Sequence, residues 1–214
     1  MKVGTEKALG VLLLGLLVTG GVRAAGYDDL MQAVELGDTP TVASFIDRGL
    51  DVNSVDPRGE TLLIIAARNG YTGLVKALVA RRAKLEAVNA VGETALAVAA
   101  FNGHVAVIDA LLAAGASPVN PDRWSALHYA AMQGHADALK ALIARGAPID
   151  APAPNGATPL MLAARGSNIE AVRVLLSARA DARVRGRDGE TALDWALKAN
   201  NTDAAALIRA AMGQ

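Results

Sequence analysis

Three histidines carry most of the side-chain chemistry that this sequence could offer, because the chain has no cysteine and therefore no thiol nucleophile. Asp122, Ser125 and His128 supply the residue types of an acid, a nucleophile and a base, so they could be read as a hydrolytic triad. His128 and His135 could instead be read as two ligands of a metal ion, which would need a third. His104 stands apart from both groups. Which interpretation holds depends on the elements that carry these side chains.

The local sequence argues against both kinds of site. Ser125 stands directly before an apolar run, where a serine hydroxyl caps a helix. Gly134 interrupts the helix between His128 and His135, so the two rings do not share one helix face. No glycine-rich phosphate loop precedes a Lys-Ser or Lys-Thr pair. The sequence therefore predicts no catalytic residues, no cofactor-binding residues and no metal site.

The stretch 89–116 has the pattern of one helical hairpin. Thr94 is placed to cap a first helix, and Gly103 and Gly115 are placed to end the first and second helices in a left-handed turn. Apolar residues fall on one face of each helix, at Leu96, Ala99 and Ala100 and then at Val107, Ile108, Leu111 and Leu112. Neither helix can bury its apolar face alone, so this hairpin requires neighbours.

The hairpin recurs along the chain at a spacing of about 33 residues. A shift of 33 superposes residues 59–63 (GETLL) on 92–96 (GETAL), and residues 156–160 (GATPL) on 189–193 (GETAL). Residues 123–127 (RWSAL) lie between them, displaced by 31 and then by 33. The apolar residues of the second helices keep the same register, at 74–79, 107–112, 138–143 and 171–176. A fixed period of this length with two helices and a turn is typical of ankyrin repeats.

Residues 28–211 resemble the ankyrin-repeat family residue by residue. The TPLH-type element appears at 158–161 (TPLM) and 125–128 (SALH), and the Gly-His pair at 103–104 and 134–135. The resemblance implies an all-α ankyrin-repeat solenoid of about six helix-turn-helix repeats, including two capping repeats, at approximately 28–55, 56–88, 89–119, 120–152, 153–185 and 186–214. It also implies that the histidines bridge main-chain groups of adjacent repeats, and that Ser125 is a helix cap.

Several residues depart from the repeat pattern. The third repeat is two residues short in the loop 115–122, which also contains Pro118 and Pro121, so we expect a clipped turn without a paired hairpin. Arg123 replaces the glycine found at 59, 92, 156 and 189. Ser167 and Asn200 stand where other repeats end the first helix with glycine. Asparagine tolerates the left-handed turn, and beside Ser167 we expect Gly166 to adopt it.

The first 24 residues predict a cleavable signal peptide. Lys2 and Lys7 precede an apolar run of 11 residues at 8–18, and Val22-Arg23-Ala24 fits a signal-peptidase site. As a helix this run would reach about 17 Å, short of the roughly 30 Å of a bilayer core. The alternative is an uncleaved anchor, if residues 19–22 also insert. The segment looks bacterial, so we expect a periplasmic domain spanning 25–214, with no stable membrane span after cleavage.

Composition sets limits on the partner. The formal net charge is zero, and residues 25–214 carry 18 basic and 20 acidic side chains, so nothing steers this domain to nucleic acid or to an anionic membrane. Aromatic residues make up 3% of the chain, which suits close helix packing and not a cofactor pocket. We therefore expect a monomer that uses no cofactor. We expect its partner to be an unidentified protein that is also periplasmic.

The family resemblance places the contact surface on a concave face formed by turns and by the outward sides of the first helices. The candidate protein-binding residues are Arg58, Glu60, Arg68, Asn69, Glu93, Phe101, Asn102, Asp122, Trp124, Met132, Gln133, Asn155 and Arg165. The same rule adds Val91, Ala157, Arg187, Glu190 and Lys198. Phe101, Trp124 and Met132 are predicted to form the binding hot spot, because large apolar side chains with polar neighbours commonly do so. Alternatively, Trp124 covers the clipped turn with Pro118 and Pro121.

Three functions are compatible with this sequence. The first is a periplasmic module that recognises a partner protein on a rigid concave surface. The second is an accessory or protective factor for a co-exported enzyme, possibly one related to oxidative stress, by analogy with small exported ankyrin proteins. The third is a secreted effector that acts on a host protein. The signal peptide and the short domain favour residence in the periplasm over the third function.

Overall fold

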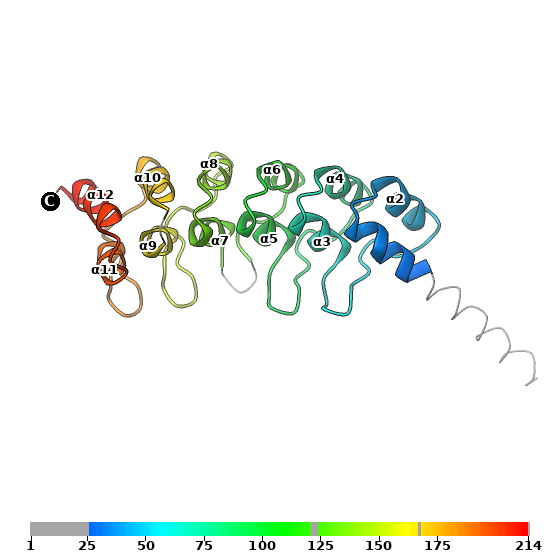
Figure 1. The fold of residues 1–214 in the computed structure, drawn as a ribbon, viewed down its shortest axis with the longest axis horizontal. Coiled ribbons are helices and arrows are strands. Elements are labelled where there is room, and N and C mark those ends of the chain that lie inside the picture. The colour runs from blue at the N-terminus through cyan, green and yellow to red at the C-terminus, as the bar shows by residue number, and fades with distance from the viewer. Residues whose placement is uncertain (1–25, 121–123, 167, 214) are drawn as a thin grey trace, which may run out of the picture.

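The computed structural model describes residues 26–120, 124–166 and 168–213, which form a row of stacked helical hairpins (Figure 1). Residues 26–35 are helical and precede α2 (Thr39–Asp47). The first helices of the following hairpins are α3 (Leu62–Arg68), α5 (Ala95–Phe101), α7 (Ala126–Gln133), α9 (Pro159–Arg165) and α11 (Ala192–Lys198). The second helices are α4 (Thr72–Ala80), α6 (Val105–Ala113), α8 (Ala136–Ala144), α10 (Ile169–Ser177) and α12 (Thr202–Met212). The two sets form two parallel rows, and the turns project beyond the row of first helices.

Local signals start and stop these helices as the sequence predicts. Thr94 and Ser125 occupy N-cap positions, and each hydroxyl accepts a hydrogen bond from the main-chain N–H three residues later. Thr61, Thr158 and Thr191 do the same in the other repeats. Gly103 and Gly134 follow the first helices with φ of 72° and 75°, in the left-handed region that glycine enters at little steric cost. The capping scheme is therefore confirmed.

The first helices are covered on both sides, and the second helices on one side. In α5 every residue from Ala95 to Ala100 is buried, because α3 and α7 pack against opposite sides of this helix. In α6 only Val107, Ile108 and Leu111 are buried, so its outer side faces solvent. Each hairpin thus buries its apolar surface against its neighbours in the row, as expected for a solenoid.

The turn between the third and fourth repeats keeps its hairpin pairing, so the expected loss of this pairing is wrong. Asn120 donates its main-chain N–H to the Trp124 carbonyl at 2.8 Å, and Val119 and Ser125 form an antiparallel bridge. The two missing residues lie before the turn: Gly115 and Asn120 are five positions apart, whereas Gly146 and Ala153 are seven apart. The shortening therefore falls on the connector from the second helix. Arg123 lies outside the described residues.

The other non-standard positions differ in their main-chain conformations. Asn200 adopts φ of 56°, as expected for an asparagine in place of glycine. Gly166 does not take the left-handed turn; its φ is −76° and its ψ 168°, so that expectation is wrong. This extended conformation directs the Gly166 carbonyl to the Asn201 side-chain amide at 2.5 Å. Ser167 lies outside the described residues. Arg82 and Arg179, basic residues near the ends of second helices, have φ of 64° and 66°, a left-handed conformation that the sequence did not predict.

Residues 1–24 lie outside the described part of the chain, so the signal peptide stays a prediction. From residue 26 onward, none of the described helices combines the length and the apolar character that crossing a membrane requires.

Candidate protein-binding face

The Ser125–His128 pair is buried and structural. The Ser125 Oγ lies 2.6 Å from the His128 Nδ1, and both side chains are 0% exposed. The His128 Nε2 lies 3.0 Å from the Ala157 carbonyl oxygen. A carbonyl only accepts, so Nε2 carries the proton and Nδ1 accepts from the Ser125 O–H and main-chain N–H. Both ring nitrogens are occupied out of reach of any substrate. Asp122 lies outside the described residues.

His104 and His135 connect neighbouring repeats, as predicted. The Nε2 atom of His104 lies 2.8 Å from the Arg68 carbonyl, and that of His135 lies 2.9 Å from the Phe101 carbonyl. These carbonyls end first helices and lack a partner within their own helix. Each histidine thus satisfies the helix end of the preceding repeat from the start of its own second helix.

Three further side chains at the same position do the same task, and sequence reasoning missed them. Tyr71 donates to the Glu35 carbonyl at 3.1 Å, and the Asn168 amide donates to the Gly134 carbonyl at 2.6 Å. The Asn201 amide donates to the Ala164 and Gly166 carbonyls. Their recurrence with the histidines, at 71, 104, 135, 168 and 201, was the signal that could have found them. We call these five side chains the inter-repeat ladder.

The first-helix face is the surface formed by the turns and by the outward ends of the first helices. Each repeat contributes to it one residue that closes the turn and one residue that lies eight positions later at the end of the helix. These pairs are Glu60 and Arg68, Glu93 and Phe101, Trp124 and Met132, Ala157 and Arg165, and Glu190 and Lys198. The face therefore presents five equivalent pairs, one from each of repeats two to six.

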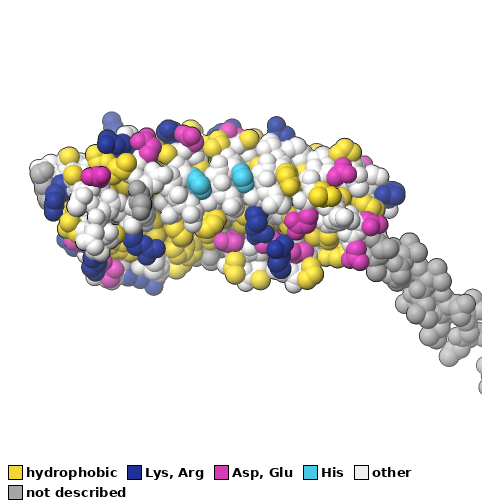
Figure 2. All heavy atoms as spheres, viewed as in Figure 1, with side chains coloured by type: hydrophobic (Ala, Val, Ile, Leu, Met, Phe, Trp, Pro, Cys, Tyr) yellow, Lys and Arg dark blue, Asp and Glu magenta, His cyan; other side chains and the backbone are white. Residues whose placement is uncertain are grey.

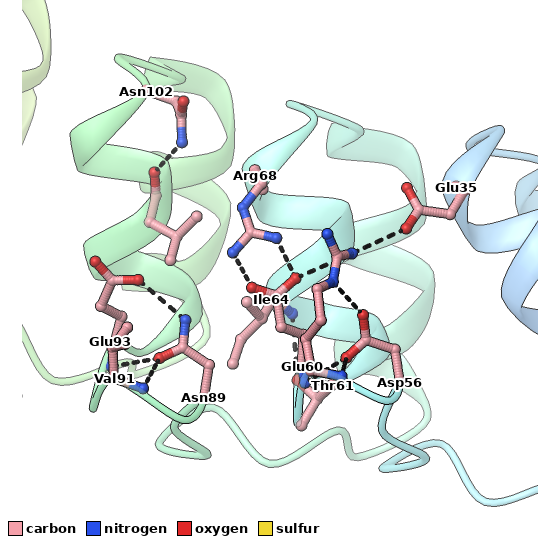
Figure 3. Close-up of polar contacts among 12 residues, drawn as sticks. Glu35, Asp56, Glu60, Thr61, Ile64, Arg68, Asn89, Val91, Glu93 and Asn102 are labelled. Atoms are coloured by element: carbon pink, nitrogen blue, oxygen red, sulfur yellow. Dashed lines mark hydrogen bonds and ion pairs between the residues drawn. The ribbon is translucent and has the colours of Figure 1, made fainter.

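The pair in the second repeat is neutralised internally (Figure 3). The two terminal nitrogens of Arg68 donate to the two carboxylate oxygens of Glu60, and Arg58 lies 3.5 Å from the same carboxylate. Glu60 is only 6% exposed. Its placement among the residues open to a partner is therefore corrected: its carboxylate is consumed within the repeat because the Arg68 side chain folds back over it.

Arg58 extends this network to the first repeat. Its Nε donates to Asp56 at 2.7 Å, and one terminal nitrogen lies 3.3 Å from Glu35. Burial of Asp56 is the largest single influence on its pKa and raises it. Hydrogen bonds from the main-chain N–H groups of Glu60 and Arg58 and from the Arg58 guanidinium outweigh burial, so the pKa of Asp56 lies below its ordinary value. The charges over α3 therefore satisfy one another.

The centre of the face carries an aromatic cluster. Phe101 is 37% exposed, and its ring meets the Tyr129 ring edge-on at 6.4 Å between centroids. Trp124 lies 6.1 Å from Tyr129 and 5.4 Å from the His128 ring. Met132 is partly buried against the same core. Figure 2 shows hydrophobic side chains at the surface around α5 and α7, beside the charged cluster over α3.

Tyr129 joins Phe101 to Trp124, and sequence reasoning missed it because it reads as an ordinary buried helix residue. The alternative role of Trp124 is to cover the clipped turn. Among the described residues, its ring contacts the His128 and Tyr129 rings of α7. Pro121 lies outside the described residues, so its contact with Trp124 stays a prediction.

The other predicted contact residues divide by exposure. Arg58, Asn69, Asn102, Gln133, Asn155 and Arg165 are exposed, as are Val91, Arg187 and Lys198. Arg68, Glu93 and Glu190 are partly buried. Ala157 is 1% exposed, and its carbonyl accepts a hydrogen bond from His128 of the preceding repeat, so its assignment to the contact surface is also corrected.

Comparison with known proteins agrees with this architecture. A family model described as ankyrin repeats in three copies matches the chain in overlapping registers, at residues 30–122, 71–155, 109–186 and 127–213. The chain belongs to the ankyrin-repeat family. No curated protein matches it.

Ankyrin arrays are protein–protein interaction modules and generally not enzymes. In this ankyrin array Ser125 caps α7 and holds the His128 ring, and His128 joins its repeat to the next one through the Ala157 carbonyl. The first-helix face carries charged pairs near its ends and aromatic side chains at its centre.

Proposed function

We propose that this ankyrin array is a periplasmic protein-binding module that recognises its partner on the first-helix face, centred on Phe101, Trp124 and Met132. The observation that carries this proposal is the exposure of Phe101. The six residues before it in α5 are all buried, yet this large aromatic side chain remains 37% exposed at the helix end. The stack does not need Phe101 for its core, and exposed aromatic residues ringed by polar groups are typical binding hot spots.

The face is preformed, which supports tight recognition. Its turns are closed by main-chain hydrogen bonds at 2.8–3.0 Å, from Asp56, Asn89, Asn120, Ala153 and Gly186 to the residues four positions later. The ladder then fixes each first helix to the next repeat. A partner that docks on such a surface loses little affinity to ordering of the array.

Periplasmic location is the part of this proposal that rests on residues 1–24. The positively charged start, the apolar run and Val22-Arg23-Ala24 predict cleavage after Ala24. Intact mass spectrometry of the exported protein is expected to show a chain that begins at Ala25. A chain that retains Met1 or Lys2 would contradict cleavage.

The binding proposal is tested by comparing affinity and stability in matched variants. Partners would be captured from periplasmic extract and their affinities measured for the wild type, Phe101→Ala and Trp124→Ala. Trp124→Ala should weaken binding by about 2 kcal/mol or more, as truncation of a central aromatic residue does. Because Trp124 also contacts two rings, its truncation should cost about 0.5–1.5 kcal/mol of stability. Phe101→Ala, with one ring contact, is the cleaner probe.

Two controls separate binding from folding. Leu111→Ala removes a 0% exposed core side chain and should cost about 2–5 kcal/mol of stability. Lys140→Ala removes an exposed side chain on α8, away from the first-helix face, and should change neither quantity appreciably. If Phe101→Ala and Trp124→Ala bind every captured partner as tightly as Lys140→Ala does, the binding surface lies elsewhere.

A further inference from the structure

The five equivalent pairs on the first-helix face differ in how many charged side chains they contain and in whether those charges form an ion pair. At both ends of the face the pair is an ion pair: Glu60 with Arg68 in repeat two, and Glu190 with Lys198 in repeat six. In repeats three and five only one member of the pair is charged. Glu93 is matched with Phe101, and Ala157 is matched with Arg165. The charges at the ends are therefore paired, whereas Glu93 and Arg165 form no ion pair with any residue that the structure describes.

Arg165 lacks the carboxylate that its equivalents have, because Ala157 stands where Glu60 and Glu190 stand. Its guanidinium lies over the Trp195 ring, 5.5 Å from the centroid, and forms no ion pair within the described chain. Stacking on an aromatic face leaves the edge of a guanidinium able to donate two parallel hydrogen bonds to a carboxylate.

Space for such a carboxylate lies beside Arg165. A pocket of about 230 Å³ is lined by Arg165, Asp188, Glu190, Trp195, Lys198 and Ala199. Its two acidic groups are already engaged: Glu190 pairs with Lys198, and the Asp188 Oδ1 accepts the main-chain N–H of Glu190 at 3.0 Å. Among the residues that the structure describes, Arg165 is the cation of this pocket that forms no ion pair.

Glu93 is the counterpart on the other side of the aromatic cluster. Its Oε2 accepts a hydrogen bond from the Asn89 amide at 3.0 Å, and it forms no ion pair with any described residue. The neighbouring cation, Arg68, donates to both oxygens of Glu60. These bonds are the main cause of its raised pKa, and the charge of Glu93 adds a smaller contribution from a distance. A basic side chain from a partner would find this carboxylate partly exposed at the edge of the cluster.

We propose that the partner presents a linear segment with a basic side chain for Glu93, a bulky apolar side chain for the aromatic cluster and an acidic side chain for Arg165. This inference rests on the proposed function and specifies the partner's chemistry. Glu93 and Arg165 are two repeats apart, which is roughly 16–20 Å if packed helices lie 8–10 Å apart. An extended chain spans that distance in about five or six residues.

The test uses a displayed library of random peptides, each about twice as long as this span. The library is selected separately against the full chain and against four variants: Glu93→Lys, Arg165→Glu, Phe101→Ala and Lys140→Gln. Lys140 is the control, because it lies on α8, away from the first-helix face, and its charge is paired with Asp137. Individual peptides are then synthesised, and their dissociation constants are measured against every variant at low and high salt.

The proposal expects wild-type peptides with basic, apolar and acidic side chains in the stated spacing. Their affinity should fall about tenfold or more in Arg165→Glu, since like charges then face each other. Peptides selected on Arg165→Glu should carry a basic residue in place of the acidic one, and those selected on Glu93→Lys should carry an acidic residue in place of the basic one. Lys140→Gln should select the wild-type pattern.

Three other results would overturn the inference in distinguishable ways. In one result, the peptides lose affinity in Phe101→Ala but carry no preferred charges, or they carry the same charges when selected on Arg165→Glu as on the wild type. This result would refute the charge pattern but would leave the proposed face standing. Peptides indifferent to Phe101→Ala would refute the face itself. Failure to select any peptide on the wild type would refute recognition of a linear segment.

Discussion

The Nε2 atom of His135 lies 2.9 Å from the main-chain carbonyl oxygen of Phe101, so the most exposed aromatic residue of the first-helix face is fixed by the next repeat. On the proposed function, this contact links stability to recognition. The ladder that joins the repeats also sets the position from which the Phe101 side chain projects.

His135→Ala should lower the free energy of unfolding by about 1–3 kcal/mol, because it leaves a helix-end carbonyl without its partner. His135→Asn should lose less, since Asn168 makes the equivalent contact in the next repeat at 2.6 Å. Urea unfolding followed by circular dichroism measures both. Equal losses for the two variants would show that the hydrogen bond contributes nothing beyond ring packing.

Gly103→Ala should be more damaging than Gly146→Ala, although both glycines have positive φ, at 72° and 79°. Both changes incur the cost of a left-handed alanine, about 1–2 kcal/mol. At Gly103 the new Cβ would also lie 2.8 Å from the His135 Nδ1, whereas at Gly146 nothing lies within 4 Å. The steric conflict should add about 1–3 kcal/mol. Thermal unfolding of the two variants side by side gives the difference directly; similar values would argue that the ladder side chains move aside freely.

Arg82→Gly should stabilise the array by up to about 1 kcal/mol. Arg82 holds φ of 64°, and the relief of left-handed strain exceeds the entropy that glycine adds to the unfolded chain. Gly49, Gly115 and Gly146 already stand at this position in other repeats. Chemical denaturation is the measurement, with Arg81→Gly as the neighbouring control, since Arg81 forms an ion pair with Asp47 and does not have positive φ. A lower midpoint for Arg82→Gly than for the wild type would contradict the strain argument.

Stability should decrease in acid, and Asp56 should account for part of the decrease. Its pKa in the folded state lies below its ordinary value, so its stabilising contribution is complete above the unfolded pKa of about 3.9. It is lost as the pH falls through the lower folded pKa. Asp38 and Asp194, whose pKa values are also lowered by hydrogen bonds from Thr41 and Thr191, contribute with the same sign.

Asp56→Asn should therefore be less stable than the wild type at neutral pH and should lose less stability between about pH 5 and pH 2. Urea midpoints across this pH range measure the slope. Asp137→Asn, which alters an exposed pair with Lys140, serves as the control and should keep the wild-type slope. A wild-type slope in Asp56→Asn would mean that this carboxyl does not couple folding to pH.

The sequence by itself determined the repeats, their caps and their order. These features are local: Thr94 caps the helix that begins one residue later, and Gly103 ends it in the left-handed turn, so a short window of sequence contains both causes. The period of about 33 residues then required the helices to stack. The same register predicted that Phe101 stands at the end of its helix with an exposed side chain.

Only the tertiary structure decided which surface groups remain available. Glu60 and Arg68 look like two free charges in the sequence, but their side chains meet when the turn folds against α3, and one of them is buried. Tyr129 joins Phe101 and Trp124 because α5 and α7 pack side by side. Such contacts depend on the separation of stacked helices and on side-chain rotamers, which no local pattern specifies. For that reason, the charges left unpaired at Glu93 and Arg165 emerge only once the repeats are stacked.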